Sequence, residues 1–204
     1  FENMALWLQF ISLSWLVWDL SGSALLSGLA AGLRGLPTLI VGPWAGVIAD
    51  RFDRRRLVIT GQIFLTGVSI VFALFVASGA VQVWHAMVYA SVSGVCFAFI
   101  MPARQALIVN TVPPEDLPNA FALSAMTVTS NRLIGGILGG LLITTVGIEW
   151  NFFVEGGAYI ATALLLIPMR TPYQEASTAR QSSVISNLKE GLVYIWKDNR
   201  IILH

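Results

Sequence analysis

Residues 46–58 read GVIADRFDRRRLV and place four arginines and two aspartates between two long apolar runs. The rest of the chain makes this concentration of charge unusual. Only 11% of the 204 residues are charged and 56% are hydrophobic, with a mean hydropathy of +0.74. A soluble domain has about 25% charged residues. The composition therefore indicates a membrane protein.

Apolar runs on both sides of the charged cluster are long enough to cross a membrane. Residues 57–103 contain no Asp, Glu, Lys or Arg, and each crossing needs about 20 apolar residues, so this run holds two helices. Strands are not expected, because the runs do not alternate polar and apolar residues. Breaks at Gly, Pro and Ser predict six transmembrane helices. We expect them at approximately 3–20, 24–48, 57–79, 83–108, 118–146 and 150–169.

Basic residues indicate which turns face the cytoplasm, since lysine and arginine favour the cytoplasmic side of short loops. The expected loops at 49–56, 109–117 and 170–204 contain or adjoin the basic residues. The three turns at the other ends of the helices contain no lysine or arginine. The charged cluster is therefore partly a signal of topology.

Topology alone does not require the acids and the glycine of this cluster. Their spacing is Gly46-x-x-x-Asp50-Arg51-x-Asp53-Arg54-Arg55. This pattern resembles motif A of the major facilitator superfamily, between helices two and three of that fold. Asp53 stands where the family usually has glycine, so we expect a different turn. The resemblance implies that Asp50 and the arginines latch the cytoplasmic side closed; the alternative is a membrane anchor with incidental acids.

Other segments extend the resemblance along nearly the whole chain. Residues 15–23, 33–37, 102–105 and 114–120 resemble, in this order, a branch that contains enterobactin exporters and macrolide efflux proteins.

Residues 132–140 read RLIGGILGG and are similar to motif C, which is associated with antiporters, with Gly136 in place of its proline. Small residues four apart also let helices approach closely, so plain helix packing is an alternative. The residues concerned are Arg132, Gly135, Gly136, Gly139 and Gly140.

Charged side chains lie inside three of the predicted helices. Arg34, Arg132 and Glu155 fall within them, and a charge in a bilayer is costly unless it faces a cavity or a partner. Arg34 and Glu155 could instead reach the interface with their side chains. Asp19, at the outer end of helix one, is another acidic candidate partner.

The family resemblance implies that helices one and four line a central substrate cavity. Small polar residues also occur at plain helix contacts, which is the alternative. The arginine of motif B, found within helix four of many proton antiporters, has no match, so proton coupling is implied without a residue to carry it. The cavity candidates are Gln9, Ser12, Trp15, Tyr89, Ser93, Cys96 and Phe97.

The C-terminal region differs from the rest. Residues 171–183 are polar, and apolar residues then recur at helical spacing, which predicts an amphipathic helix on the cytoplasmic surface. We expect a six-helix bundle at 1–170 and a cytoplasmic linker at 171–204. The chain begins without methionine, and the resemblance implies the N-terminal half of a twelve-helix, all-α fold. Each half would consist of two inverted three-helix repeats, and the C-terminal half would be the partner.

Enzymatic motifs are absent from the sequence. There is no nucleotide-binding loop, no His-Glu-x-x-His and no Cys-x-x-Cys, so we expect no enzyme, cofactor, metal or nucleic acid. The resemblance implies a secondary transporter of the bacterial inner membrane, surrounded by lipid. It would export drugs, siderophores or similar amphipathic small molecules, with protons as the coupling ion. A lysophospholipid or nutrient transporter on the same fold and a non-transporting scaffold or receptor remain as alternatives.

Overall fold

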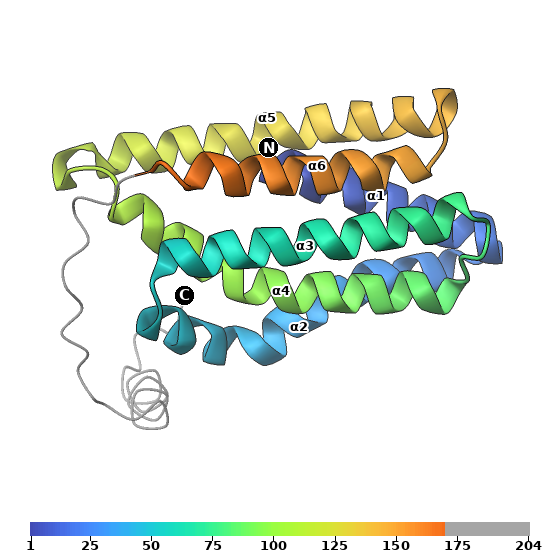
Figure 1. Cartoon of the computed structure of the whole chain (residues 1–204), viewed down its shortest axis with the longest axis horizontal. Helices are drawn as coiled ribbons and strands as arrows, with labels where there is room; N and C mark the ends of the chain where they lie inside the picture. The colour runs from blue at the N-terminus through green and yellow to red at the C-terminus, as the bar shows by residue number, and fades with distance from the viewer. Residues whose placement is uncertain (170–204) are drawn as a thin grey trace, which may run out of the picture.

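The computed structural model describes residues 1–169, apart from the side chains of residues 43 and 47–51. These residues form helices throughout, without a strand. The chain runs back and forth along the long axis of the bundle (Figure 1). The elements are α1 (Glu2–Ser21), α2 (Ala24–Arg51), α3 (Arg54–Ala77), α4 (Val83–Val109), the short 3-10 helix η1 (Pro114–Asp116), α5 (Leu117–Thr145) and α6 (Glu149–Leu166).

The all-helical prediction is confirmed for the described residues, and five helices are long and apolar enough to span a membrane. They are α1 to α5. Helix α6 has 18 residues and includes Glu149 and Glu155, so a sixth span remains a prediction. The linker and amphipathic helix expected at 171–204 lie outside the described residues.

The predicted loop at 49–56 is wrong, because most of it is helical. Helix α2 continues to Arg51 and α3 begins at Arg54. The reason is a helix cap: Oδ1 of Asp53 accepts a hydrogen bond from the backbone N–H of Arg56 at 3.0 Å. Asp53 has φ −59° and ψ 110°, which any L-residue can adopt, so this turn does not need the glycine found in the family.

The sixth helix ends at Leu166 and not at residue 169 as expected. Pro168 explains the difference, since proline has no N–H to donate to a carbonyl oxygen of the preceding turn. The other helix ends lie within three residues of the prediction.

The helix contacts repeat themselves within the bundle. The most extensive pairs are α2 with α4, α3 with α6 and α1 with α5. Suppose that α1, α2 and α3 are exchanged, in order, with α4, α5 and α6. The α2–α4 pair then becomes the α5–α1 pair, and the α3–α6 pair becomes itself. Because the chain reverses at each turn, α1 and α4 run in opposite directions (Figure 1). This is the arrangement expected of two inverted three-helix repeats.

Glycines allow close approach at the two contacts that this exchange relates. A Cβ at Gly94 of α4 would lie 2.3 Å from the carbonyl oxygen of Arg34 in α2. A Cβ at Gly135 of α5 would lie 2.8 Å from the carbonyl oxygen of Met4 in α1. Both neighbours are backbone atoms, so the helices would have to separate to admit a side chain.

The replacement Gly94→Ala tests the close α2–α4 contact. We expect it to destabilise the full-length protein by roughly 1–3 kcal/mol, because the added methyl overlaps a backbone oxygen. The melting temperature of the purified protein in detergent measures this effect. Gly67→Ala is the control, since a Cβ there meets nothing within 4 Å and alanine favours the helix. Equal melting temperatures for the two variants would contradict the expectation.

Replacements of Asp53 test the cap of α3. Asp53→Ala removes the acceptor for the Arg56 N–H and should lower the free energy of unfolding by about 1 kcal/mol. Asp53→Gly should lower it by only a few tenths of a kcal/mol. The same melting experiment measures both. A larger loss with glycine than with alanine would show that the side chain of Asp53 does not act as a cap.

Candidate functional site

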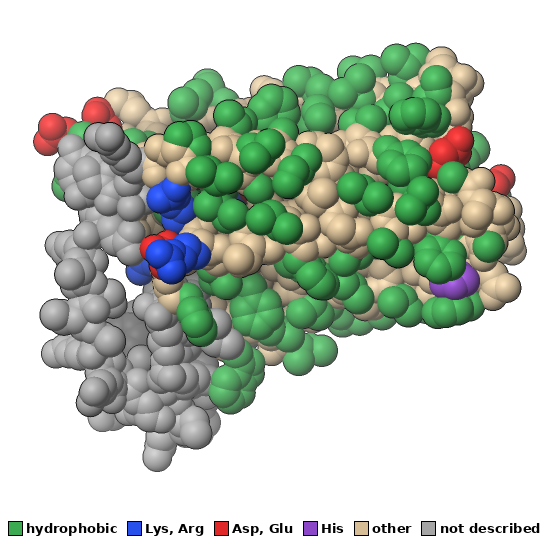
Figure 2. All heavy atoms as spheres, in the orientation of Figure 1, with side chains coloured by type: hydrophobic (Ala, Val, Ile, Leu, Met, Phe, Trp, Pro, Cys, Tyr) green, Lys and Arg blue, Asp and Glu red, His purple; other side chains and the backbone are tan. Residues whose placement is uncertain are grey.

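The two ends of the bundle differ in charge. Among the described residues, arginine side chains gather at the end that holds the α2–α3 turn, and His85 lies at the other end (Figure 2). Trp18, Trp84 and Trp150 are about half exposed near that second end. This distribution supports the expected orientation, with the α2–α3 turn in the cytoplasm.

The arginines of the motif A pattern contact the ends of two other helices. Arg55 Nε donates to the carbonyl oxygen of Leu166 at 2.9 Å, and its Nη2 donates to that of Ile167. Arg54 Nη1 donates to Oδ1 of Asn110 at 3.3 Å. Arg55 therefore satisfies the last carbonyls of α6, where the helix dipole also favours a cation.

For the other charged residues of the predicted latch, the structure describes only the backbone. Asp50 and Arg51 lie in the last turn of α2, and their side chains are outside the description. Gly46 is partly buried, and a Cβ there would meet nothing within 4 Å. The latching role of these residues stays a prediction.

A further ion pair joins α1 and α4 at the same end. Arg104 Nη1 lies 3.3 Å from Oε2 of Glu2 and donates to Oδ1 of Asn3 at 3.2 Å. Our sequence reasoning missed Glu2, because it began the first helix one residue too late. An acid in the first turn of a helix would have been the signal.

A hydrogen-bonded cluster lies inside the bundle where α3, α4 and α6 meet. Glu155 has 0% of its surface exposed, and its Oε1 accepts from the hydroxyls of Tyr89 at 2.8 Å and Tyr159 at 3.0 Å. The Tyr89 and Ser69 hydroxyls are 2.9 Å apart. We call these four residues the Glu155 cluster. Sequence reasoning found Glu155 and Tyr89 but missed the others, although Tyr159 lies one helical turn from Glu155.

Most of the predicted cavity residues are buried within the bundle. Gln9 Nε2 donates to Ser93 Oγ at 3.1 Å and links α1 to α4, whereas Ser12 bonds to Leu8 O of its own helix. Cys96 is partly buried, and Trp15 is 50% exposed. The structure thus brings Ser93 and Tyr89 to the side chain of Gln9 and leaves Trp15 apart. Their role in a substrate cavity stays a prediction. Those with little or no exposed surface are Gln9, Ser12, Tyr89, Ser93 and Phe97.

The two arginines inside the membrane-spanning helices contact aromatic rings. Arg34 lies 5.0 Å from the ring centre of Phe97 and donates to the carbonyl oxygen of Leu6 at 3.2 Å. Arg132 lies 4.6 Å from the ring centre of Trp7. Among the described residues neither forms a salt bridge, and Asp19 is exposed at the end of α1. Ring faces therefore stabilise both guanidinium groups, together with a backbone carbonyl oxygen in the case of Arg34.

Three of the four glycines in the motif C-like segment contact α1, and the fourth does not. Gly135 and Gly139 are buried against α1, and Gly136 approaches Ile11 of that helix. A Cβ at Gly140 would meet nothing within 4 Å. The first three glycines contribute to helix packing, and a function in antiport stays a prediction for the segment.

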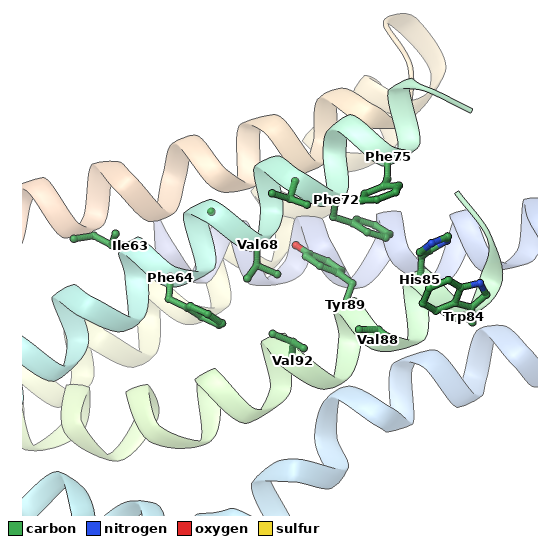
Figure 3. Close-up of a pocket in the computed structure, with 12 residues that line it drawn as sticks. Ile63, Phe64, Val68, Phe72, Phe75, Trp84, His85, Val88, Tyr89 and Val92 are labelled. Atoms are coloured by element: carbon green, nitrogen blue, oxygen red, sulfur yellow. The ribbon is translucent and has the colours of Figure 1, made fainter. Parts of the chain in front are cut away.

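An apolar groove of about 470 Å³ lies between α3 and α4. Phe72 and Tyr89 stack in its wall with ring centres 4.2 Å apart, and Trp84 and His85 lie at one end (Figure 3). The hydroxyl of Tyr89 points from the groove toward α3 (Figure 3). Tyr89 therefore connects the groove to the Glu155 cluster. No group of three potential metal ligands occurs among the side chains that the structure describes.

Comparison with known proteins gives a consistent result along the chain. The uncharacterized MFS-type transporter YfiS of Bacillus subtilis is 27% identical over 93% of this chain and 45% of its own length. The multidrug resistance protein MdtH of Klebsiella pneumoniae is 28% identical over 89% of this chain and 42% of its own. The staphyloferrin A transporter of Staphylococcus aureus is 26% identical over 80% and 41%.

The chain thus spans less than half the length of each of these relatives. The profile of the transmembrane secretion effector family matches residues 1–202, which is nearly the whole chain. Together with the helical bundle and the motif A pattern, this match shows that the chain belongs to the transmembrane secretion effector family of major facilitator superfamily (MFS) transporters.

Proposed function

We propose that the full-length protein is a secondary active transporter of the bacterial inner membrane. It exports drugs, siderophores or similar amphipathic small molecules by alternating access, and the proton gradient drives it. The described bundle is the N-terminal six-helix half of a twelve-helix fold. The C-terminal half of the same chain is its partner, and the substrate lies between the halves.

The uncovered faces of α2 and α5 carry this proposal. Only 6% of the spanning segment of α2 and 11% of that of α5 are buried, against 39% in α1 and α3 and 50% in α4. In the inverted-repeat arrangement, these two helices occupy equivalent places. A second half that packs on both would cover them and leave a space between the halves.

The exposed face of α5 is also too polar to be a plain lipid-facing surface. Thr127, Thr129 and Ser130 are exposed, and so is Arg132 near the middle of the helix. Charged residues in membrane-spanning helices almost always face a protein interior or an aqueous cavity. This favours contact of α5 with the other half or with the transport path.

The names of two relatives support the class of substrate. One is a multidrug resistance protein and another is a staphyloferrin A transporter. The superfamily consists of transporters and not enzymes, which supports a non-enzymatic role. For this chain, export and proton coupling follow only by analogy with its family.

Accumulation assays in bacteria test the proposed function. The full-length protein is expressed in cells that lack their own exporters, and a fluorescent cationic dye, a macrolide and a catecholate siderophore are offered in turn. We expect lower accumulation of at least one compound and loss of this effect with a protonophore. Unchanged accumulation of all three would contradict the proposal and favour a lipid or nutrient transporter, or a scaffold.

The latch at the cytoplasmic end can be tested in the same cells. Asp50→Asn should reduce export roughly tenfold, because the resemblance implies that the Asp50 carboxylate stabilises one end state and a charge-assisted hydrogen bond is worth about 1.5–3 kcal/mol. Glu115→Gln is the matched control, since Glu115 is an exposed acid between α4 and α5. Export by Asp50→Asn at the wild-type rate, with equal amounts of protein in the membrane, would reject the latch.

A further inference from the structure

We propose that Glu155 is the residue that carries the coupling proton, with Tyr89 and Tyr159 as its hydrogen-bond donors. This inference rests on the proposed gradient-driven transport and assigns it to a carboxyl group. That carboxyl group is entirely buried between α3, α4 and α6.

Glu155 has the surroundings of a neutral carboxylic acid. It forms no salt bridge with any residue of the described part of the chain. An unpaired carboxylate in a membrane-spanning bundle is very costly, so the group holds a proton in this conformation. Oε1 acts as the carbonyl oxygen and accepts from both tyrosines. Oε2 has no partner among the described residues and is the oxygen that takes up and releases the proton.

Charged and titratable groups approach Glu155 from a few directions only. Tyr89 comes from α4, Tyr159 from α6 itself, and Arg34 from α2 acts on the carboxyl through its charge. From α3 the approaching group is the hydroxyl of Ser69, which is not titratable in this range. Arg34 is thus the cation available to a deprotonated Glu155.

Loss of the proton leaves a negative charge in the Glu155 cluster, and this charge attracts a cation. A carboxylate at Glu155 attracts the guanidinium of Arg34, which in this structure bonds to Leu6 O of α1 and lies over the ring of Phe97. Arg34 belongs to α2, one of the two helices with an uncovered face. Proton release therefore pulls on a helix that would contact the other half. This links the charge on Glu155 to the rocking of the two halves.

Unpartnered polar groups continue from Glu155 toward both ends of the bundle. Asn151, one turn nearer the start of α6, is fully buried and its Oδ1 has no partner among the described residues. Gln62 of α3 lies one turn from Thr66, whose Oγ1 contacts the carbonyl oxygen of Gly156 in α6. Both polar atoms of the buried Gln62 side chain lack a described partner. Such groups are rare in interiors, and here they mark a path for the proton.

A purely structural role for the cluster predicts a different outcome from a proton site. The carbonyl oxygen of glutamine can accept from both tyrosines as Oε1 of Glu155 does, so Glu155→Gln preserves these contacts. Glutamine cannot bind and release a proton. The variant therefore separates the two roles, and Glu149→Gln, six residues earlier in the same helix, is the matched control.

The first experiment measures the proton directly. Infrared difference spectra of the purified full-length protein in lipid should contain a pH-dependent band of a protonated carboxyl. We expect wild type and Glu149→Gln to show the band and Glu155→Gln to lack it. If Glu155→Gln does not fold, Tyr159→Phe replaces it, and the band should move to higher frequency because its carbonyl loses a donor. If the band is unchanged in Glu155→Gln, or in Tyr159→Phe where that variant replaces it, the protonated carboxyl does not belong to Glu155 and the proposal is overturned.

The second experiment measures coupling in proteoliposomes with the fluorescent cationic dye as the probe. Dye exchange at equal pH on both sides gives the reference rate for each variant, and the comparison is made among variants that exchange dye. With a pH gradient, wild type and Glu149→Gln should accumulate dye and Glu155→Gln should not. Gradient-driven accumulation by Glu155→Gln would overturn this inference alone. Failure of the wild type with dye, macrolide and siderophore would reject the proposed function, while the infrared result would still decide whether Glu155 holds a proton.

Discussion

The cost of an unpaired polar group in a membrane determines how this bundle is built. Lipid offers no hydrogen bonds, so polar atoms must find partners within the protein. The chain satisfies this in two ways. At the end that holds the α2–α3 turn, Arg55 binds the last carbonyls of α6, and Arg104 pairs with Glu2. Inside the bundle, the carboxyl of Glu155 accepts from two hydroxyl groups and forms no salt bridge with a described residue. The first arrangement fixes helix ends, whereas the second leaves an acid whose charge the surroundings do not balance.

Close helix contacts make the second arrangement possible. Gly94 brings the backbone of α4 against that of α2, and Gly135 does the same for α5 against α1. These contacts are related by the exchange of the two three-helix repeats, so one packing solution is used twice. With α2 and α5 held in this way, the remaining helices enclose the Glu155 cluster. The same packing leaves α2 and α5 with little buried surface, as expected for helices that contact a second half.

Sequence reasoning predicted the helices well because apolar runs of spanning length have few other interpretations. The prediction of a loop was wrong at the charged residues between α2 and α3, most of which are helical. The arginines at 54–56 suggested a loop, yet Asp53 caps a helix that begins among them. The site was only partly predictable. Glu155 stands out as an acid in an apolar run, but Ser69 looks like any small polar residue, and its closeness to Tyr89 depends on how α3 and α4 pack.

The two candidate sites lie at different depths, and α4 and α6 connect them. Arg54 and Arg55 bind Asn110 and the last carbonyls of α6, so the turn that carries the motif A pattern is attached to the C-terminal ends of α4 and α6. Those helices hold Tyr89, Tyr159 and Glu155 farther along their length. A helix transmits displacement along its axis because its backbone hydrogen bonds keep it rigid. A change of charge at Glu155 that shifts α6 against α4 therefore also strains the arginine contacts at the C-terminal ends of these helices. This couples the proposed proton site to the proposed latch without any direct contact between them.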